Sequence, residues 1–94
     1  MSTSKIPRIG LGLFGRTRFA ILILLFKRSP ESFYLRELAR IVGTGLGAVQ
    51  RELRHLERIG VVRRTPANRR VYYAADKRGP AYRELSALVR TLTR

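Results

Sequence analysis

Apolar residues recur at helical spacing in two adjacent segments near the middle of the chain. In the first segment they follow an i, i+3, i+4, i+7 pattern at Leu35, Leu38, Ala39 and Val42. In the second they form one stripe at Val49, Leu53 and Leu56. Gly43 stands between the segments and suits the left-handed residue that ends a helix. The pattern predicts two short amphipathic helices joined by a tight turn, with the second helix over about residues 46–58.

The face of the second helix opposite its apolar stripe is polar and rich in arginine. It carries Gly47, Gln50, Arg51, Arg54, His55 and Arg58. A tight turn between two short helices, with cationic and amide side chains on the outer face of the second, is what binding in a DNA major groove requires. Taken alone, such a face is more often simply a solvated helix surface.

The segment after this helix favours the DNA-binding interpretation. VVRRTPANRRVYYA contains two short β-prone runs around a polar turn that includes Pro66 and Asn68, which predicts a hairpin. Four arginines flank the turn, namely Arg63, Arg64, Arg69 and Arg70. From Arg51 to Arg70 there are seven arginines and two glutamates, a net charge of +5. A basic hairpin directly after such a helix predicts a winged helix-turn-helix.

The run LRELARIVGTGLGAVQRELRHLERIGVVRR, followed by RRVYYAAD, resembles the ArsR-like and MarR-like winged-helix transcription regulators of bacteria and archaea. It is most similar to a subgroup whose winged helix occurs joined to, or encoded beside, a nucleotidyltransferase domain. The resemblance extends from about Leu13 to the C-terminus and implies operator binding as a dimer. Gly45 stands where the family commonly has serine, and Thr44 where it has an apolar residue. Glycine is an acceptable N-cap, and Thr44 is expected to supply the missing hydroxyl contact to phosphate.

The N-terminal part divides into two segments. Residues 1–12 contain Ser, Thr, Pro and Gly and are predicted to form a flexible arm. Leu13 to Arg28 is predicted to be a helix that is apolar on every side from Phe19 to Phe26, so two surfaces must cover it. Eight apolar residues are too few for the ~20 of a membrane span, and no small-residue cleavage site follows them. We therefore expect the domain core on one side, a second subunit on the other, and no membrane.

The C-terminal part is expected to complete the sheet and the dimer. After the helix stop at Ser29-Pro30, Phe33 and Tyr34 are predicted to add a third strand to the wing. Tyr72 and Tyr73 are expected to pack within the sheet, with base stacking as the alternative. Helical periodicity resumes from Ala81 to Leu92. The predicted dimer interface consists of Phe19, Ile23, Phe26, Leu85, Leu88 and Leu92; the alternative is that these residues simply close the monomer core.

Composition limits the possible functions. The chain has 94 residues, a net charge of +14 and no cysteine. So large a positive charge indicates a polyanionic partner, and the absence of cysteine excludes disulfides and thiolate chemistry. His55 is the only histidine, and six acidic residues are spread singly along the chain. This inventory predicts neither an enzyme nor a metal or other cofactor site.

The sequence therefore predicts an α+β, mostly helical, winged helix-turn-helix over residues 13–94, with a two- to three-stranded wing and an extra C-terminal helix. We expect a cytoplasmic, nucleoid-associated homodimer that binds double-stranded DNA sequence-specifically and regulates transcription. Gln50, Arg51 and Arg54 are the candidates for base contacts. Contacts with phosphates or the minor groove are assigned to Arg58, Arg63, Arg64, Asn68, Arg69 and Arg70. The alternative is a module that binds structured RNA or tethers a partner protein, such as a separate nucleotidyltransferase.

Overall fold

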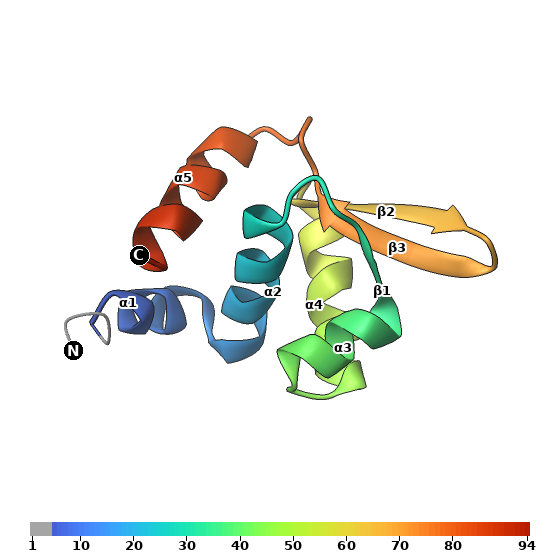
Figure 1. The fold of residues 1–94 in the computed structure, drawn as a ribbon, viewed down its shortest axis with the longest axis horizontal. Helices are drawn as coiled ribbons and strands as arrows, with labels where there is room; N and C mark the ends of the chain where they lie inside the picture. The colour runs from blue at the N-terminus through green and yellow to red at the C-terminus, as the bar shows by residue number, and fades with distance from the viewer. Residues whose placement is uncertain (1–4) are drawn as a thin grey trace.

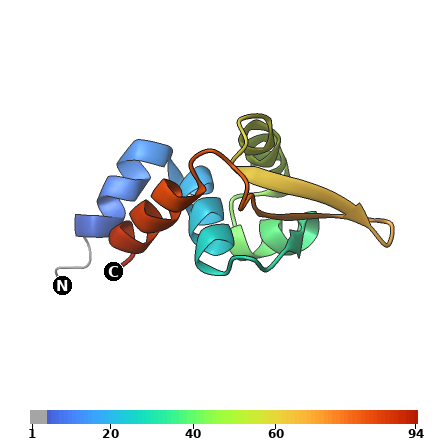
Figure 2. The same cartoon turned by 90° about the horizontal axis from the view of Figure 1, so that it is seen from above.

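The computed structural model describes residues 5–94, which form five helices and one three-stranded antiparallel sheet (Figure 1). In chain order these are α1 (Lys5–Phe14), α2 (Arg16–Lys27), β1 (Phe33–Tyr34), α3 (Leu35–Val42), α4 (Leu46–Arg58), β2 (Val62–Ala67), β3 (Arg70–Ala75) and α5 (Tyr82–Leu92). The helix pair α3–α4 followed by the β2–β3 hairpin confirms the predicted α+β winged-helix fold. The molecule measures 44 × 28 × 19 Å, with the wing at one end and α1 and α5 at the other (Figures 1 and 2).

The turn between α3 and α4 contains two glycines with positive φ. Gly43 ends α3 in the left-handed conformation, with φ +79°, and its N–H donates to the carbonyl oxygen of Ala39 at 2.9 Å. Gly45, the N-cap of α4, has φ +100° and ψ +146°, a region that residues with a side chain rarely adopt. Serine, the better N-cap on an ordinary backbone, does not fit this one. The turn therefore requires glycine at position 45.

The wing has the strand order β1-β3-β2, so that β1 joins the sheet as predicted. Phe33 pairs with Tyr73, and Val62 pairs with Ala75. The hairpin turn consists of Asn68 and Arg69, with φ of +51° and +64°, which is the signature of a type I′ turn. The prediction that Pro66 lies in the turn is wrong. Pro66 lies within β2, where proline is tolerated because β2 is an edge strand.

The core is built around α2. Its buried side chains are Phe19, Ile21, Leu22, Leu25 and Phe26. Helices α1, α3, α4 and α5 and strand β3 all pack against α2. A single chain therefore covers most of this helix and leaves Ala20, Ile23 and Leu24 half-buried, so that its burial does not require a second subunit.

This packing also changes the predicted dimer interface. Phe19, Phe26 and Leu92 are only 3%, 6% and 3% exposed within one chain, which leaves them almost no surface to offer a partner. Ile23, Leu85 and Leu88 are half-buried. The apolar stripe of α5 faces α2 of the same chain, as in the alternative of simple core closure.

The predicted flexible arm is largely a helix. Residues 5–12 belong to α1, and residues 1–4 lie outside the described part of the chain. Gly10 sits so close to the ring of Phe19 that a β-carbon there would collide with it. Two glycines make a helix intrinsically unfavourable, by about 1 kcal/mol each, and packing on α2 and α5 offsets that cost. The predicted single helix from Leu13 to Arg28 is interrupted at Gly15, where φ is +80°.

Among residues 5–94, no single helix has both the length and the apolar character needed to cross a bilayer. One helix pair, Arg8–Phe14 with Arg16–Lys27, meets that test when taken together, and it is bent by 114° at the break.

The backbone at Gly45 generates the first prediction. We expect Gly45→Ser to lower the free energy of unfolding by about 1–3 kcal/mol, because serine is forced into a conformation that favours glycine. Urea denaturation of the two proteins measures the difference. Gly12→Ser is a matched control, because Gly12 is also exposed but a β-carbon there meets nothing and φ is not positive. Equal or greater stability of Gly45→Ser would contradict the assignment.

Candidate nucleic-acid interface

The outer face of α4 is a continuous arginine stripe. Arg51, Arg54 and Arg58 follow Gly47 at i+4, i+7 and i+11, and all four residues are exposed. The opposite face carries the fully buried Val49, Leu53 and Leu56. Burial of that apolar stripe fixes the rotation of α4 and therefore directs the arginines to solvent. Gln50 and His55 flank the stripe and are half-buried.

The N-terminal end of α4 has little bulk. No atom comes within 4 Å of the position that a β-carbon would occupy on Gly45, and only the guanidinium of Arg51 approaches that position on Gly47, at 3.5 Å. Leu46 projects between the two glycines and is 43% exposed. Sequence reasoning missed this residue. Its spacing from Val49 and Leu53 fits the buried stripe, but Leu46 lies beyond the edge of the core.

Two polar contacts tie this region to α2. Arg18 donates two hydrogen bonds to the carboxylate of Glu52, from Nε at 2.7 Å and from Nη2 at 3.1 Å. The hydroxyl of Thr17 donates to the hydroxyl oxygen of Thr44 at 2.9 Å. That bond leaves the hydroxyl proton of Thr44 available for a phosphate. Glu52 on α4 therefore forms an ion pair with Arg18 on α2.

The ion pair between Arg18 and Glu52 is partly shielded, with side chains 34% and 23% exposed. The hydrogen bond from Arg18 to Glu52 raises the pKa of Arg18 above its ordinary value, desolvation opposes the shift, and Coulomb attraction to Glu52 adds to it. Because the folded pKa is raised, the stabilisation from Arg18 is complete below its ordinary pKa and is lost only as the pH rises through the raised value. Arg18 therefore stays charged wherever the protein is studied.

The wing divides its arginines between two faces of the sheet. Val62 is buried in the core beside α4, and Arg64 alternates with it on the same face of β2. Arg63 and Arg70 lie on the other face. The guanidinium of Arg70 stacks over the ring of Tyr34, at 4.3 Å from the centroid. Of the four predicted wing arginines, Arg64 and the turn residue Arg69 are therefore best placed to act with α4.

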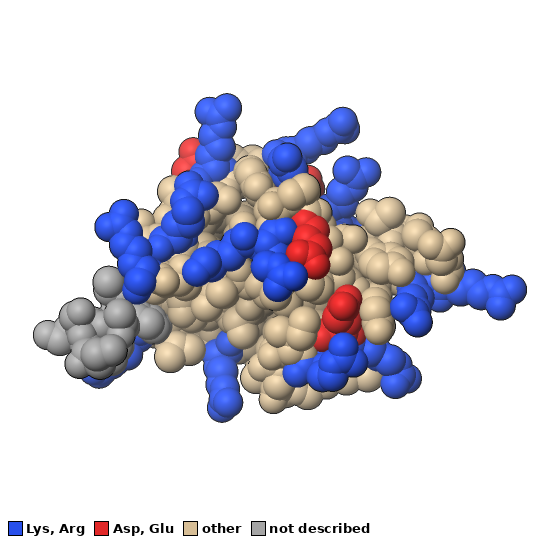
Figure 3. Space-filling view, in the orientation of Figure 1, with Lys and Arg blue, Asp and Glu red and all other residues tan. Residues whose placement is uncertain are grey.

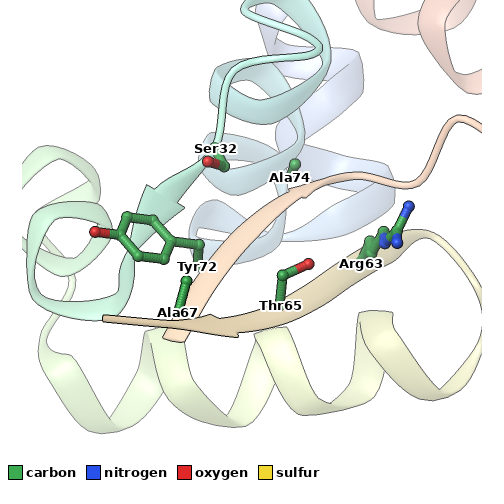
Figure 4. Close-up of a pocket in the computed structure, with 6 residues that line it drawn as sticks. All are labelled: Ser32, Arg63, Thr65, Ala67, Tyr72 and Ala74. Atoms are coloured by element: carbon green, nitrogen blue, oxygen red, sulfur yellow. The ribbon is translucent and has the colours of Figure 1, made fainter. Parts of the chain in front are cut away.

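The outer face of the sheet is hollowed beside Tyr72 (Figure 4). The floor consists of small side chains, and Arg63 lies toward one end. The hollow is lined by Ser32, Arg63, Thr65, Ala67, Tyr72 and Ala74. Tyr72 meets Tyr34 edge to face, with ring centroids 6.2 Å apart, whereas Tyr73 is buried in the core. The expectation that these tyrosines pack within the sheet is confirmed for Tyr73 and holds for Tyr72 through its contact with Tyr34.

Within residues 5–94, no three His, Asp or Glu side chains come together as a metal site would require. His55 lies beside the arginine stripe of α4. The side chains gathered on this surface are cations and amides, which recognise phosphates and base edges.

A protein-family model, HVO_A0114, matches residues 13–78, which span α2 to the end of the wing. The chain belongs to the HVO_A0114 family. The match covers the helix-turn-helix and the sheet and stops before α5. Comparison with curated proteins finds no match, and neither does comparison with solved structures. The resemblance to ArsR-like and MarR-like regulators stays a prediction.

The link between α2 and α4 generates the second prediction. In a double-mutant cycle, Arg18→Gln and Glu52→Gln should each destabilise the protein and should show a coupling free energy of about 0.5–1 kcal/mol, the range for a partly exposed ion pair. Urea denaturation of the four proteins measures it. The neighbouring pair Arg28 and Glu31, which is more exposed, is the comparison cycle and should couple more weakly. Strict additivity of Arg18→Gln and Glu52→Gln would show that their contact does not hold α4.

Proposed function

We propose that this protein is a transcription regulator that binds double-stranded DNA sequence-specifically, as a homodimer, with α4 in the major groove. The observation that carries the proposal is the arginine stripe of α4, which is exposed on a helix whose other face is buried in the core. A rigid helix with such a face fits the width of the major groove of B-DNA, about 12 Å. A regulator of this kind would reside with the DNA of the cell.

The stripe combines side chains that discriminate between bases. Arg51 and Arg54 are assigned to guanine O6 and N7, and Gln50 to adenine N6 and N7, each bidentate pair giving about 1–3 kcal/mol of discrimination. Leu46 is assigned to a thymine methyl group, because it is the exposed apolar side chain at the end of α4 and the residues beside it have no side chain. Gly45 and Gly47 would let the backbone approach the base edges closely.

The remaining cations are assigned to the phosphate backbone. Arg58 lies at the C-terminal end of the stripe, and Arg64, Asn68 and Arg69 extend along the wing. Thr44 adds a hydroxyl donor at the turn. Such contacts fix the register of the protein on DNA and carry no sequence information. Together they predict strongly salt-dependent binding, because log K falls by about 0.9 per phosphate contact for each decade of salt.

Dimer formation is assigned to α1 in place of the predicted α2 and α5 surface. Ile9, Leu11 and Leu13 are 53%, 45% and 64% exposed, and α1 packs beside α5. Ile9 and Leu13 lie one turn apart on one face of α1, and exposed apolar side chains that share a face favour a partner. A two-fold axis beside that face would bring the same residues of both chains together. Two copies would then bind half-sites about one helical turn apart.

The third prediction separates base contacts from phosphate contacts. Arg51→Ala should weaken binding to a selected site and relax its sequence preference, whereas Arg69→Ala should weaken binding to all duplexes alike. Selection from randomised duplexes gives the site, and fluorescence anisotropy gives both affinities. Random duplex DNA, double-stranded RNA and single strands serve as competitors. Equal competition by double-stranded RNA would favour the structured-RNA alternative, because the deep, narrow major groove of RNA does not admit a helix.

The fourth prediction concerns the dimer. Leu13→Glu should shift the protein from dimer to monomer in sedimentation at micromolar concentration, because it places a charge in the proposed α1 interface. Its fold should persist, since Leu13 is 64% exposed. Ile41→Glu, at a similarly exposed position of α3, is the matched control and should leave the dimer intact. A well-folded monomer for the unmutated chain would refute dimerisation through α1.

A further inference from the structure

Most of the positive charge lies outside the elements assigned to DNA recognition. Residues 46–75, from the start of α4 to the end of the wing, carry seven arginines and two glutamates, a net charge of +5 out of +14. The remaining residues therefore carry +9. Lys77 to Arg94 alone contains five basic residues and one acidic residue, a net charge of +4 over 18 residues. Recognition of one duplex by α4 and the wing leaves this second concentration of charge without a role.

The charge of this segment is organised along α5. Arg83 and Arg90 lie seven residues apart on one face of α5, and Arg94 follows just beyond the C-terminal end of the helix. All three are exposed. Lys77 and Arg83 line the same hollow at the start of the helix. We call these four residues the α5 basic stripe. The opposite side of α5 is fixed in the core by the buried Val89 and Leu92.

Glu84 lines the same hollow as Lys77 and Arg83, but no acidic side chain in the described part of the chain forms an ion pair with the stripe. The ion pairs among the described side chains are Arg18 with Glu52 and Arg28 with Glu31, and neither involves α5. Like charges that repel one another destabilise a compact protein. A polyanion bound along the stripe would relieve that repulsion.

The stripe is separated from the surface assigned to the first duplex. Helix α2 packs against both α4 and α5, and α5 lies at the end of the molecule away from the wing (Figures 1 and 2). In the space-filling view, Lys and Arg side chains project at both ends of the long axis (Figure 3). A duplex bound by α4 and the wing would therefore leave α5 accessible.

We propose that the α5 basic stripe binds the phosphate backbone of a second DNA duplex, so that the protein bridges two duplexes. The proposal rests on the proposed function for the first duplex. From Arg83 to Arg90 the stripe spans about 10 Å along α5 at about 1.5 Å per residue, a length over which duplex DNA carries about six phosphates. The contacts are charge contacts only, so this second site is independent of sequence.

The chemistry of the stripe favours DNA over a lipid surface. Helices that lie on membranes insert large apolar side chains beside their basic residues. Between its arginines the exposed face of α5 offers Ala87 and Thr91, and the large exposed hydrophobic residues of the described chain lie on other elements. A small, polar surface between cations fits a phosphate backbone.

A two-duplex capture experiment tests the bridge. Beads carrying a biotinylated duplex with the selected site are loaded with the full-length protein and then offered a fluorescent random duplex. We expect the unmutated protein to retain the second duplex, and the double variant Arg83→Gln/Arg90→Gln to retain about tenfold less, as expected for the loss of two phosphate contacts. Binding of the first duplex should change less than about twofold. Arg16→Gln/Lys27→Gln is the control, because it removes the same charge from exposed positions of α2.

Each other outcome is decisive. If the control Arg16→Gln/Lys27→Gln retains as little of the second duplex as the α5 variant does, the effect comes from net charge, and the proposed role of the α5 basic stripe is overturned. Binding of the first duplex without capture of a second by the unmutated protein would overturn the bridge and leave the proposed function intact, whereas no duplex binding would remove both. If Leu13→Glu no longer retains the second duplex and the α5 variant still does, the two α4 surfaces of a dimer form the bridge, and the α5 basic stripe does not. If the α5 variant still retains the second duplex but no longer binds phosphatidylserine vesicles, the α5 basic stripe binds a lipid surface and not DNA.

Discussion

The fold depends on the burial of the apolar side chains of α2. From Phe19 to Phe26 every residue is apolar, so no side of this helix can face water without cost. Helices α1 and α5 come from opposite ends of the chain and pack against α2, while α3, α4 and strand β3 complete the enclosure. Fully burying a Leu or Ile side chain contributes about 1.5–3 kcal/mol, and α2 supplies several. The positions of the other elements follow from the need to cover it.

That enclosure determines what α4 exposes. The apolar face of α4 is at most 2% exposed at Val49, Leu53 and Leu56. The rotation of α4 about its axis is therefore fixed, and its arginines must point outward. The contacts from Arg18 to Glu52 and from Thr17 to Thr44 add polar links at the same interface. The base-contacting role proposed for α4 rests on this rigidity, because a loosely held helix could not present bidentate donors in register.

The same enclosure separates the charge of the molecule into two regions. Arginines of α4, Arg64 and the wing turn form the surface proposed for the first duplex, and the α5 basic stripe lies on the other side of α2. Both surfaces lie on helices whose apolar faces are locked in one core. The proposed bridge would therefore hold two duplexes in a fixed relative orientation, which distinguishes it from a bridge through a flexible basic tail.

Local patterns in the sequence determined α3, α4, the hairpin and α5, because side-chain periodicity and turn residues act within a few residues of the chain. Three features of the candidate site depended on the folded structure. The turn conformation favours glycine at position 45, the sheet register decides on which face Arg64 lies, and the limit of the core leaves Leu46 exposed. Tertiary packing alone decided that residues 5–12 are helical and that α2 is covered within one chain. Gly10 against Phe19 is a contact between two helices, and no periodicity in either segment encodes it. Long-range packing outweighed local propensity at both places.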